Sequence, residues 1–408
     1  MKCGLLGRKL GHSYSPQIHS LLGNYHYDLI EVEPELLKSA LDNTEYTGFN
    51  VTIPYKKAVI PFCDTLSPVA QRLGAVNTIV RRRDGSLIGH NTDYFGFQTM
   101  VESTGLQVSG KKVLVLGSGG ASNTVCAVME QLGANVIVIS RSGDNNYGNI
   151  HLHSDAAVIV NATPVGMYPA VGISPVDLAA FPMLEGVLDV IYNPARTQLL
   201  LDAEKRGLIT ANGLLMLVAQ AKESAEWFTG NTISDEQISR IHGILKQQME
   251  NIVLIGMPGC GKSTVGKLLA ESLNKQFIDA DDEIVAAAGK PIPRIFAEDG
   301  ESVFRNWESQ ILEKLGKQSG LIIATGGGCV TQNRNYPLLH QNGTVFWIGR
   351  NIEQLPTDGR PLSQATRLQD MFRVREPMYR AFADHYVDNN GSVEKTVSKI
   401  LSLWEGEQ

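Results

Sequence analysis

Short apolar runs recur along the whole chain, and stretches with a helical spacing of apolar positions separate them. Apolar runs of this length are typical of β-strands. After residue 110 the first three runs are separated by crossovers long enough for βαβ units, which predicts α/β layers. The predicted strands are residues 48–53, 112–117, 134–140, 156–162, 186–192, 251–256, 320–325 and 343–349.

Residues 222–249 carry a pattern of polar and apolar positions that predicts two helices. Ser234 would begin the second helix, because a Ser followed three residues later by Gln237 is a capping-box pattern. The apolar run 251–256 follows at once, without a spacer rich in Gly, Ser or Pro. The chain is therefore predicted to contain two blocks that meet near residue 250 with almost no flexible linker.

The densest basic stretch is "RRRDG", Arg81–Gly85, which lies between the runs "NTIV" and "SLIGHNTD". An Asp-Gly pair between two such runs predicts the turn of a β-hairpin. We therefore interpret these arginines as part of a solvated hairpin and not as a binding patch.

Length and composition narrow the class of protein. A chain of 408 residues is long enough for two or three domains. The formal net charge of -6 speaks against a general nucleic-acid-binding surface. The N-terminus turns polar too early for a signal peptide, and no apolar run reaches the ~18 residues that a membrane span needs. Five scattered cysteines without a CxxC pair predict reduced thiols in a cytoplasmic protein. The oligomeric state is left open.

A phosphate-binding loop follows the run 251–256. The residues "GMPGCGKS", Gly256–Ser263, match the pattern G-x-x-x-x-G-K-[ST] in full, between a predicted strand and a predicted helix. In such a loop backbone N–H groups bind phosphates, the Lys holds the β- and γ-phosphates, and the Ser ligates Mg²⁺. The predicted ATP-binding residues are Gly259, Cys260, Gly261, Lys262, Ser263 and Thr264.

The residues after this loop indicate what receives the phosphate. Asp279 and Asp281 alternate at the end of a predicted strand, so we expect them to share a face. One would serve Mg²⁺, and the other would orient an acceptor hydroxyl. Arg305, Arg360 and Arg375 stand in separate segments, and Arg is suited to bidentate capture of a carboxylate. Together these residues predict a small anionic acceptor that also carries a hydroxyl group.

From residue 250 to its end the chain resembles shikimate kinase. The resemblance is carried by the phosphate loop and by "DADDEI", "GESVFRNWE", "TGGG", "GRPL" and "REPMY". It implies a P-loop NTPase-type kinase in which Lys262 and Asp281 are catalytic and in which Ser263 and Asp279 hold Mg²⁺. The residues that it places at shikimate are Asp281, Arg305, Gly326, Gly327, Gly328 and Arg375.

The same resemblance places Arg360 in a lid that closes over ATP and stabilises charge on the transferring phosphoryl group. The lid segment "NIEQLPTDGRPL" is compact beside the usual form of the family. The residues that contact adenine are therefore not assigned.

A second glycine turn, "LGSGGAS", follows the predicted strand 112–117 and precedes a helix-like stretch. Ser122 occupies the third glycine position of G-x-G-x-x-G, so the match to a dinucleotide-binding loop is partial. The next strand ends in "VISRS", and an Arg at this point accepts the 2′-phosphate of NADP, where an acidic residue would bind the ribose of NAD. Arg141 therefore favours NADP, although a surface Arg after a strand is equally typical.

Polar residues at the ends of apolar runs predict a substrate site within the first 100 residues. Singly, each is more typical of a cap or a turn. A Lys with a carboxylate suits ketone reduction, because the ammonium stabilises and protonates the alkoxide that hydride transfer produces. The residues are Ser13, Ser15, Thr52, Lys56, Asn77, Asn91 and Asp93.

Residues 1 to about 249 resemble shikimate dehydrogenase. The resemblance is carried by "NVTIPYK", "GAVNT", "NTD", "GSGGA", "NATPVGM", "DVIYNPARTQLL" and "ANGLLMLVAQA". It implies that Lys56 and Asp93 are catalytic. The substrate-binding residues that it implies are Ser13, Ser15, Thr52, Asn77, Asn91, Tyr192 and Gln220. The NADP-binding residues that it implies are Gly117, Gly119, Gly120, Ala121, Arg141 and Gly213.

The cofactor part departs from this family between the strands 134–140 and 156–162. Ser140 stands where the family usually has Asn, and a short stretch, residues 141–155, separates the two strands. The family normally fits a helix and another strand there, so we expect a βα unit to be shortened or lost. His151 and His153 in this stretch are interpreted as solvated loop residues.

The predicted fold is α/β throughout. It comprises a substrate part at 1–99 and 213–249, a Rossmann-type NADP part at 100–212 and a P-loop kinase domain at 250–408.

Two glycine loops in one chain are explained by two consecutive reactions. These are reduction of 3-dehydroshikimate to shikimate by NADPH, and phosphorylation of shikimate by ATP with Mg²⁺. No nucleic acid or membrane partner is expected.

Two alternatives stay open at this point. In one, the front half is impaired in cofactor binding and captures shikimate to regulate or stabilise the kinase. In the other, the P-loop half phosphorylates a different hydroxy acid, against which the three arginines and Asp281 argue. A purely structural role is disfavoured, because a scaffold needs neither Lys56 nor Lys262.

Overall fold

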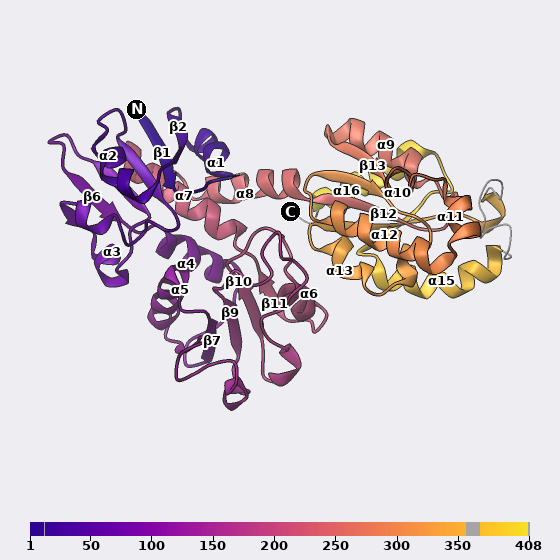
Figure 1. The fold of residues 1–408 in the computed structure, drawn as a ribbon, viewed down its shortest axis with the longest axis horizontal. Helices are drawn as coiled ribbons and strands as arrows, with labels where there is room; N and C mark the ends of the chain where they lie inside the picture. The colour runs from indigo at the N-terminus through magenta and orange to yellow at the C-terminus, as the bar shows by residue number, and fades with distance from the viewer. Residues whose placement is uncertain (12, 356–367, 407–408) are drawn as a thin grey trace. The chain divides into compact units, whose positions relative to one another are not determined.

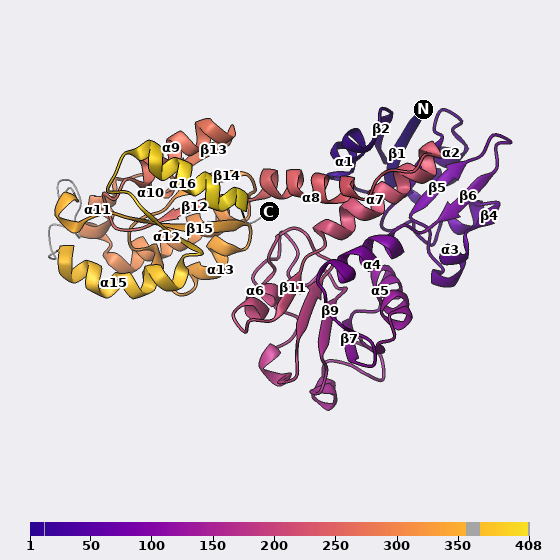
Figure 2. The same ribbon diagram turned by 180° about the vertical axis from the view of Figure 1, so that it is seen from behind.

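The computed structural model describes residues 1–11, 13–355 and 368–406, and these residues form two compact units (Figures 1 and 2). The first unit comprises residues 1–166, 173–192 and 202–244. The second unit comprises residues 167–172, 193–201 and 245–408. Helix α8 (Glu236–Met249) contains the boundary after residue 244, and β12 begins two residues after the helix ends, at Asn251.

The first unit begins with a six-stranded mixed sheet of order β2-β1-β3-β5-β6-β4. Apolar side chains of this lobe, among them Phe49, Tyr55 and Ile79, form its buried core. The strands are β1 (Lys2–Gly7), β2 (His26–Glu31), β3 (Gly48–Val51), β4 (Thr65–Leu66), β5 (Thr78–Arg81) and β6 (Leu87–His90). The helices are α1 (Ser15–Leu22), α2 (Leu37–Asp42) and α3 (Pro68–Leu73), with 3-10 turns η1 (Pro34–Leu36) and η2 (Ile60–Phe62).

The predicted hairpin is confirmed. Strands β5 and β6 pair antiparallel, with Arg81 opposite Leu87. The turn between them closes with a hydrogen bond from the N–H of Arg82 to the carbonyl of Ser86, and Gly85 has a φ of +88°. A positive φ at this position suits Gly, so the Asp-Gly pair terminates the strand as the pattern indicates.

A second sheet in the first unit is entirely parallel, with the order β11-β10-β9-β7-β8. The chain reverses its direction of winding at β7, and ligands of open parallel sheets bind beside the carboxyl end of such a strand. The strands are β7 (Lys112–Leu116), β8 (Asn135–Ile139), β9 (Val158–Asn161), β10 (Gly186–Asp189) and β11 (Ile209–Ala211). The other elements are α5 (Gly120–Gln131), α6 (Gln198–Glu204), η3 (Ile150–His153) and η4 (Leu178–Ala180).

The expected loss of a βα unit is confirmed. Between β8 and β9 the structure contains the 3-10 turn η3 and no strand or α-helix, and β8 is therefore the edge of its sheet. The intervening loop folds back on itself, because Asn149 Oδ1 accepts from the N–H of Asn146 at 2.7 Å and the N–H of Ser140 donates to the carbonyl of Asn145 at 3.1 Å. His153 Nε2 lies 3.0 Å from Asn145 Oδ1, so His153 is tied into this loop and is not a free solvated side chain.

Two helices join the mixed sheet to the parallel sheet within the first unit. Helix α4 (Asp93–Ser103) packs along α7 (Leu214–Thr229) and also against α5. Buried Phe97 and Met100 of α4 belong to the core of the parallel sheet. Because α4 begins at Asp93, this packing determines where the predicted catalytic carboxylate lies.

The second predicted helix of the 222–249 region is confirmed as α8, but its expected capping box is not. The box requires the Ser234 hydroxyl to accept from the N–H of Gln237. That N–H donates to the carbonyl of Ser234 instead, and the Gln237 side chain accepts from Arg240 at 2.7 Å. Arg240, about one turn further along the helix, therefore binds the Gln237 side chain that the capping box would use.

The second unit is built around a five-stranded parallel sheet of order β13-β14-β12-β15-β16. Helices cover both faces: α9 packs with α16 on one, and α12 packs with α13 on the other (Figures 1 and 2). The strands are β12 (Asn251–Ile255), β13 (Gln276–Asp279), β14 (Leu321–Ala324), β15 (Gly343–Gly349) and β16 (His385–Asp388).

The helices of the second unit include short pieces that shape its loops. The α-helices are α9 (Lys262–Leu273), α10 (Ala280–Ala288), α11 (Ile292–Glu298), α12 (Glu301–Gly316), α13 (Asn335–His340), α15 (Leu368–Phe382) and α16 (Val393–Gly406). The 3-10 turns are η5 (Cys329–Thr331) and η6 (Ile352–Gln354). Each strand predicted from the apolar runs is present in the structure, as β3, β7, β8, β9, β10, β12, β14 and β15.

Candidate active sites

The phosphate loop lies between β12 and α9, at the point where the chain winds to either side of β12. Gly256, Gly259 and Gly261 have φ angles of +143°, +81° and +102°. Side chains other than Gly are strained there, so the glycines allow the backbone to curl around a phosphate. The carbonyl of Cys260 accepts from Asn389 Nδ2 at 2.8 Å, which attaches the loop to the end of β16.

Lys262, the first residue of α9, is buried beneath this loop. Its Nζ donates to the carbonyls of Gly256 at 2.9 Å and Met257 at 3.0 Å. These two bonds hold the ammonium across the curve of the loop. The position suits the predicted contact with the β- and γ-phosphates of ATP.

Ser263 and Asp279 fit a magnesium ion. The Ser263 hydroxyl donates to Asp279 Oδ2 at 2.7 Å, so a hydroxyl and a carboxylate oxygen stand together beside the phosphate loop. Mg²⁺ is bound by oxygen atoms, and in kinases it takes one or two protein ligands together with phosphates. The oxygen donors that the structure brings together are the ones that such a site needs.

The expectation that Asp279 and Asp281 share one face of a strand is wrong. Strand β13 ends at Asp279, whose Oδ1 accepts from the N–H of Asp281 at 3.1 Å and caps α10. Asp281 therefore lies in the first turn of a helix. An Asp followed by a helix-forming run is a strong N-cap, and this local bond outweighs continuation of the strand.

One cavity of about 450 Å³ joins the phosphate loop to the predicted acceptor residues. The predicted residues that line it are Gly259, Gly261, Lys262, Ser263, Thr264, Asp279, Asp281, Arg305, Gly326, Gly327, Gly328 and Arg375. Residues that the sequence analysis did not identify also line it, namely Pro258, Ile292, Pro293, Phe296, Phe304, Glu308, Thr325 and Arg350.

Two predicted residues of this site stand apart from the others. Cys260 does not line the cavity: its side chain is fully buried, and its N–H donates to the carbonyl of Met257 at 3.2 Å. Arg360 lies outside the described residues.

Arg305, on α12, is held by acidic residues of its own helix. Its Nη1 donates to Glu308 Oε2 at 2.8 Å, and its Nη2 donates to Glu301 Oε1 at 3.1 Å. Glu308 is completely buried, and burial raises its pKa to about 7 although Arg305 acts to lower it. Glu308 stands one helical turn after Arg305 in the quoted "GESVFRNWE", and this spacing was the signal that could have identified it.

Arg375, on α15, reaches the glycine turn after β14. Its Nη1 donates to the carbonyl of Gly327 at 3.1 Å, and the hydroxyl of Tyr379 donates to the same carbonyl. A Cβ on Gly327 would lie 2.6 Å from Cδ of Pro258 in the phosphate loop. The turn is thus wedged between α15 and the phosphate loop, which brings the acceptor residues close to the phosphate-binding residues.

We expect Tyr379→Phe to raise KM for the predicted acceptor, shikimate, roughly tenfold, because removing a buried hydrogen bond to Gly327 lets the turn and Arg375 shift. KM for ATP should change less, since the phosphate loop loses only the weak contact of the Tyr379 hydroxyl with Met257 Sδ at 3.9 Å and keeps the hydrogen bonds from Lys262 and Asn389. Steady-state kinetics of phosphorylation, with each substrate varied in turn, measure both constants. Tyr386→Phe is the matched control, because Tyr386 is 55% exposed and lines no part of this cavity. Equal effects of the two substitutions would contradict the assignment.

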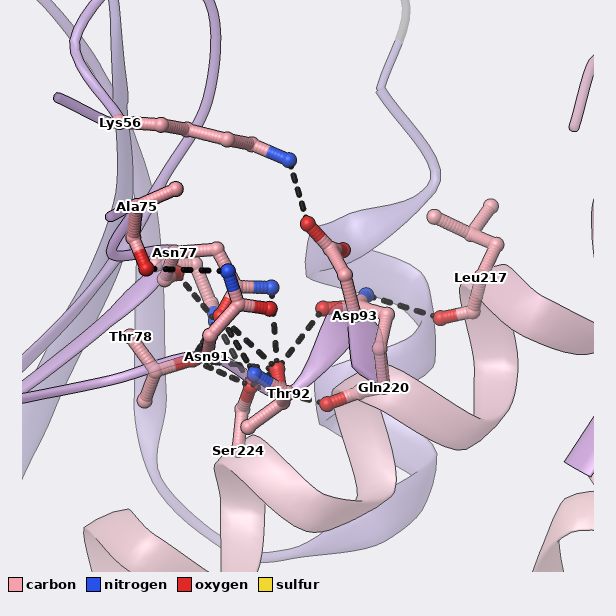
Figure 3. Close-up of polar contacts among 11 residues, drawn as sticks. Lys56, Ala75, Asn77, Thr78, Asn91, Thr92, Asp93, Leu217, Gln220 and Ser224 are labelled. Atoms are coloured by element: carbon pink, nitrogen blue, oxygen red, sulfur yellow. Dashed lines mark hydrogen bonds and ion pairs between the residues drawn. The ribbon is translucent and has the colours of Figure 1, made fainter. Parts of the chain in front are cut away.

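In the first unit the predicted catalytic pair is in contact. Lys56 Nζ donates to Asp93 Oδ2 at 2.6 Å, as Figure 3 shows. Lys56 comes from the turn after β3, and Asp93 comes from the first turn of α4. Both side chains are mostly buried, so the ion pair is screened less than a surface pair and Lys56 is directed into the site.

Beneath this pair lies a buried network of hydroxyl and amide groups (Figure 3). Asn77 Oδ1 accepts from the N–H of Thr92 at 2.7 Å, and Asn77 Nδ2 donates to Thr92 Oγ1 at 3.1 Å. Thr78 and Ser224 complete the network. Asn77 is therefore engaged in holding the start of α4, one residue before Asp93.

Asn91 lies beside this network with one amide atom available. Its Nδ2 donates to the carbonyl of Ala75 at 3.0 Å, while no described residue bonds to its buried Oδ1. An unpartnered buried acceptor is costly unless a ligand or water satisfies it. The atom is suited to accept from a substrate hydroxyl.

The remaining predicted substrate residues come from several elements. Gln220 Oε1 of α7 accepts from Thr92 Oγ1 at 3.4 Å, which places it next to Asp93 (Figure 3). The Ser13 hydroxyl accepts from the N–H of Ser15 at 3.2 Å, where α1 begins. Tyr192 packs edge-to-face against Tyr14, with ring centroids 6.2 Å apart. The serine turn is thus adjacent to the end of β10.

Thr52 directly follows β3, four residues before Lys56, and its N–H donates to the carbonyl of Leu6 at 3.0 Å. Strand β1, which pairs parallel with β3, ends at Gly7 beside Thr52, where a Cβ on Gly7 would lie 2.8 Å from Thr52 Cγ2.

The glycine turn after β7 fits a dinucleotide. Gly117 has a φ of +105°, and α5 begins directly after Gly119. Gly119 and Gly120 are exposed at this helix N-terminus, where the first backbone N–H groups have no partner within the helix and suit a phosphate. Arg141 is exposed just after β8, at the end of the neighbouring strand.

Gly213 starts α7 close to the end of β10. A Cβ on Gly213 would lie 2.0 Å from the carbonyl oxygen of Val190, so no larger residue fits without moving the backbone. Ala121 occupies the first turn of α5. The predicted NADP residues thus gather at the carboxyl ends of β7, β8 and β10.

Two family models match the chain. Residues 5–79 match the shikimate dehydrogenase substrate binding domain, and residues 258–405 match shikimate kinase. The shikimate dehydrogenase (NADP(+)) of Bacillus cereus strain B4264 is 34% identical over an alignment of 266 residues that covers 58% of this chain and 96% of that protein.

Solved structures similar to the chain are also dehydrogenases. Shikimate dehydrogenase 1 from Peptoclostridium difficile is 38% identical with a TM-score of 0.55, over 60% of this chain and 97% of that one. The enzyme from Thermus thermophilus, solved with NADP(H) and shikimate, is 29% identical with a TM-score of 0.55, over 59% of this chain and 98% of that one. Among the described residues, no helix is long and apolar enough to cross a membrane.

Proposed function

The chain belongs to the shikimate dehydrogenase family and carries a shikimate kinase domain after it, so it is a bifunctional enzyme of the shikimate pathway, and we propose how its residues divide the two reactions. The first reaction is reduction of 3-dehydroshikimate to shikimate with NADPH. The second is phosphorylation of shikimate with ATP and Mg²⁺. The observation that carries the assignment of the first reaction is the direct contact between Lys56 and Asp93.

In the reduction, NADPH supplies the hydride. The Lys56 ammonium stabilises the negative charge that develops on the carbonyl oxygen of 3-dehydroshikimate and then protonates that oxygen. Asp93 holds Lys56 in place and accepts from a substrate hydroxyl. Asn91 Oδ1 and Gln220 bind further hydroxyl groups, and the serine turn with Tyr192 binds the rest of the substrate.

In the phosphorylation, ATP with Mg²⁺ supplies the phosphoryl group. Lys262 neutralises charge on the phosphates, and Ser263 with Asp279 holds the metal ion. Arg305 and Arg375 bind the shikimate carboxylate, and Asp281 orients the attacking hydroxyl. Arg305, Arg375 and the phosphate loop line the same cavity, so a carboxylate bound by the two arginines lies in the cavity that also receives the phosphates.

The decisive experiment tests the first unit, because its cofactor part lacks a βα unit. NADPH oxidation at about 340 nm is followed with 3-dehydroshikimate and the full-length chain, and ATP consumption with shikimate is measured in parallel. We expect turnover in both assays. Phosphorylation without any reduction would instead indicate a front half that binds substrate and does not reduce it, whereas the NADP(+)-dependent relatives favour turnover.

Arg141→Ala should raise KM for NADPH roughly tenfold and leave KM for NADH nearly unchanged, because a charge-assisted bond to the 2′-phosphate is lost only with NADPH. Arg141 is exposed, so the protein should keep its fold. Initial rates at varied NADPH and NADH measure the effect. Arg82→Ala, which removes an exposed hairpin arginine, is the control. An unchanged preference between the two cofactors would remove Arg141 from the site.

Four further features stay predictions. They are the domain boundaries of the sequence analysis, the cytoplasmic location, the absence of nucleic-acid partners and the roles of individual site residues.

A further inference from the structure

Glu308 is a buried carboxyl group in the wall of the phosphorylation cavity that the reaction described above does not use. Its side chain is fully buried on α12, and Oε2 accepts from Arg305 Nη1 at 2.8 Å. Its other oxygen, Oε1, is buried and has no hydrogen-bond partner among the described residues. A buried carboxyl oxygen in this state requires a ligand, a water or a proton.

A second unpartnered oxygen lies opposite it. Asp281 Oδ1, on α10, is also buried and without a hydrogen bond from any described residue. A Cβ placed on Gly326 would lie 2.8 Å from Glu308 Oε1 and 2.9 Å from Asp281 Oδ1. The two oxygens are therefore no farther apart than the sum of these distances. Both residues line the cavity described above, so the two oxygens lie within reach of one hydroxyl group of a bound acceptor.

Groups from several elements face Glu308. On its own helix these are Arg305 and, beyond it, Glu301; Asp281 faces it from α10 and Arg375 from α15. Cys329 of η5 is also near, but burial raises the pKa of its thiol to about 12, so it stays neutral. Burial raises the pKa of Glu308 to about 7, and Arg305 and Arg375 only partly oppose this effect. Oε2 faces the guanidinium of Arg305, so a proton on Glu308 resides on Oε1.

We propose that Glu308 is a further substrate-binding residue of the phosphorylation site and that it acts as a neutral acid. Its Oε1–H donates to the oxygen of an acceptor hydroxyl group, and the proton of that same hydroxyl points to Asp281 Oδ1. The arrangement rests on the proposed kinase function. It recognises a hydroxyl group as donor and acceptor together, which a protonated amine or an ether cannot reproduce.

A purely structural role for Glu308 would be to hold Arg305 in position. That role uses Oε2 and is shared with Glu301, which contacts the same guanidinium from a more exposed site. It leaves Oε1 unexplained. The two roles differ in their dependence on pH, because holding a cation favours the ionised form, whereas donating to a hydroxyl requires the proton.

The test is the pH dependence of KM for shikimate, measured by phosphorylation at saturating ATP and Mg²⁺ without nicotinamide cofactor. In the wild-type chain KM should rise roughly tenfold or more between about pH 6 and about pH 8.5, as Glu308 loses its proton. Glu308→Gln keeps an oxygen for Arg305 and a permanent N–H donor for the substrate. Its KM should stay near the low-pH value of the wild type over the whole range.

Glu301→Gln is the matched control, and its KM for shikimate should rise with pH as it does in the wild type. The proposal would be overturned if KM for shikimate still rose with pH in Glu308→Gln, or if KM of Glu308→Gln were raised at every pH.

Gly326→Ala provides a second test. Its Cβ lies close to both oxygens, and Gly326 does not have a positive φ that would strain alanine. It should raise KM for shikimate at all pH values and leave KM for ATP near that of the wild type; an unchanged KM for shikimate would also contradict the proposal. If the wild-type chain does not phosphorylate shikimate at all, the proposed function itself fails.

Discussion

Lys56→Ala is expected to slow NADPH-dependent reduction of 3-dehydroshikimate by roughly a hundredfold or more, while phosphorylation of shikimate proceeds at the rate of the unmodified chain. The loss follows because the ammonium that the 2.6 Å contact with Asp93 directs into the site is absent, so the developing alkoxide is neither stabilised nor protonated. Oxidation of NADPH and consumption of ATP, measured on the same preparation, test both parts.

Lys57→Ala is the matched control for this substitution. Lys57 is the next residue and is exposed, whereas Lys56 is part-buried. Its removal should leave both rates within about twofold of the unmodified chain. If Lys56→Ala abolished both activities in a folded protein, two separate active sites could not be maintained. If it left reduction intact, Lys56 would not be the proton donor.

Lys262→Ala is expected to have the opposite effect, a loss of phosphorylation by roughly a hundredfold or more with reduction unchanged. Two causes combine. The charge that neutralises the phosphates is removed, and the loop loses the two hydrogen bonds from Nζ to the carbonyls of Gly256 and Met257. We expect weaker ATP binding as well as slower transfer, so both kcat and KM for ATP should be measured.

Lys267→Ala provides the control for this substitution, because Lys267 lies on the same helix, α9, with its side chain exposed. It should phosphorylate shikimate at the unmodified rate. Full phosphorylation by Lys262→Ala would remove the phosphate loop from the mechanism. A parallel loss of reduction in a folded protein would show that the two units do not work separately.

The strands of the parallel sheets were predictable from the sequence because their apolar runs are continuous. A strand such as β12 is buried on both faces, so every position from Asn251 to Ile255 is shielded from water and the apolar run marks the element directly. The glycine loops were predictable for a local reason too. A positive φ at Gly259 or Gly261 is readily adopted only by a residue without a Cβ, so the glycines themselves mark the loop in the sequence.

Helix starts were less predictable, because nearby side chains compete for the same donors. The alternation of Asp279 and Asp281 predicts one face of a strand, whereas the Asp279 side chain caps α10 and ends β13 there. Gln237 was expected to complete a capping box, and Arg240 takes its side chain instead. In both cases the outcome depends on differences of about 1 kcal/mol between alternative hydrogen bonds.

The sequence by itself determined the strands of the parallel sheets and the two glycine loops, since each of these depends on residue type and short-range spacing, and its resemblance to shikimate dehydrogenase implied Lys56 and Asp93 as the catalytic pair. Only the tertiary structure decided that Lys56 and Asp93 are in contact, and that Asn91 and Glu308 each keep a buried oxygen without a partner among the described residues. Whether a buried polar atom is satisfied depends on neighbours that are far away in the chain. Glu308 lies opposite Asp281 because α10, α12 and the turn at Gly326 pack around one cavity, and no local pattern specifies that packing.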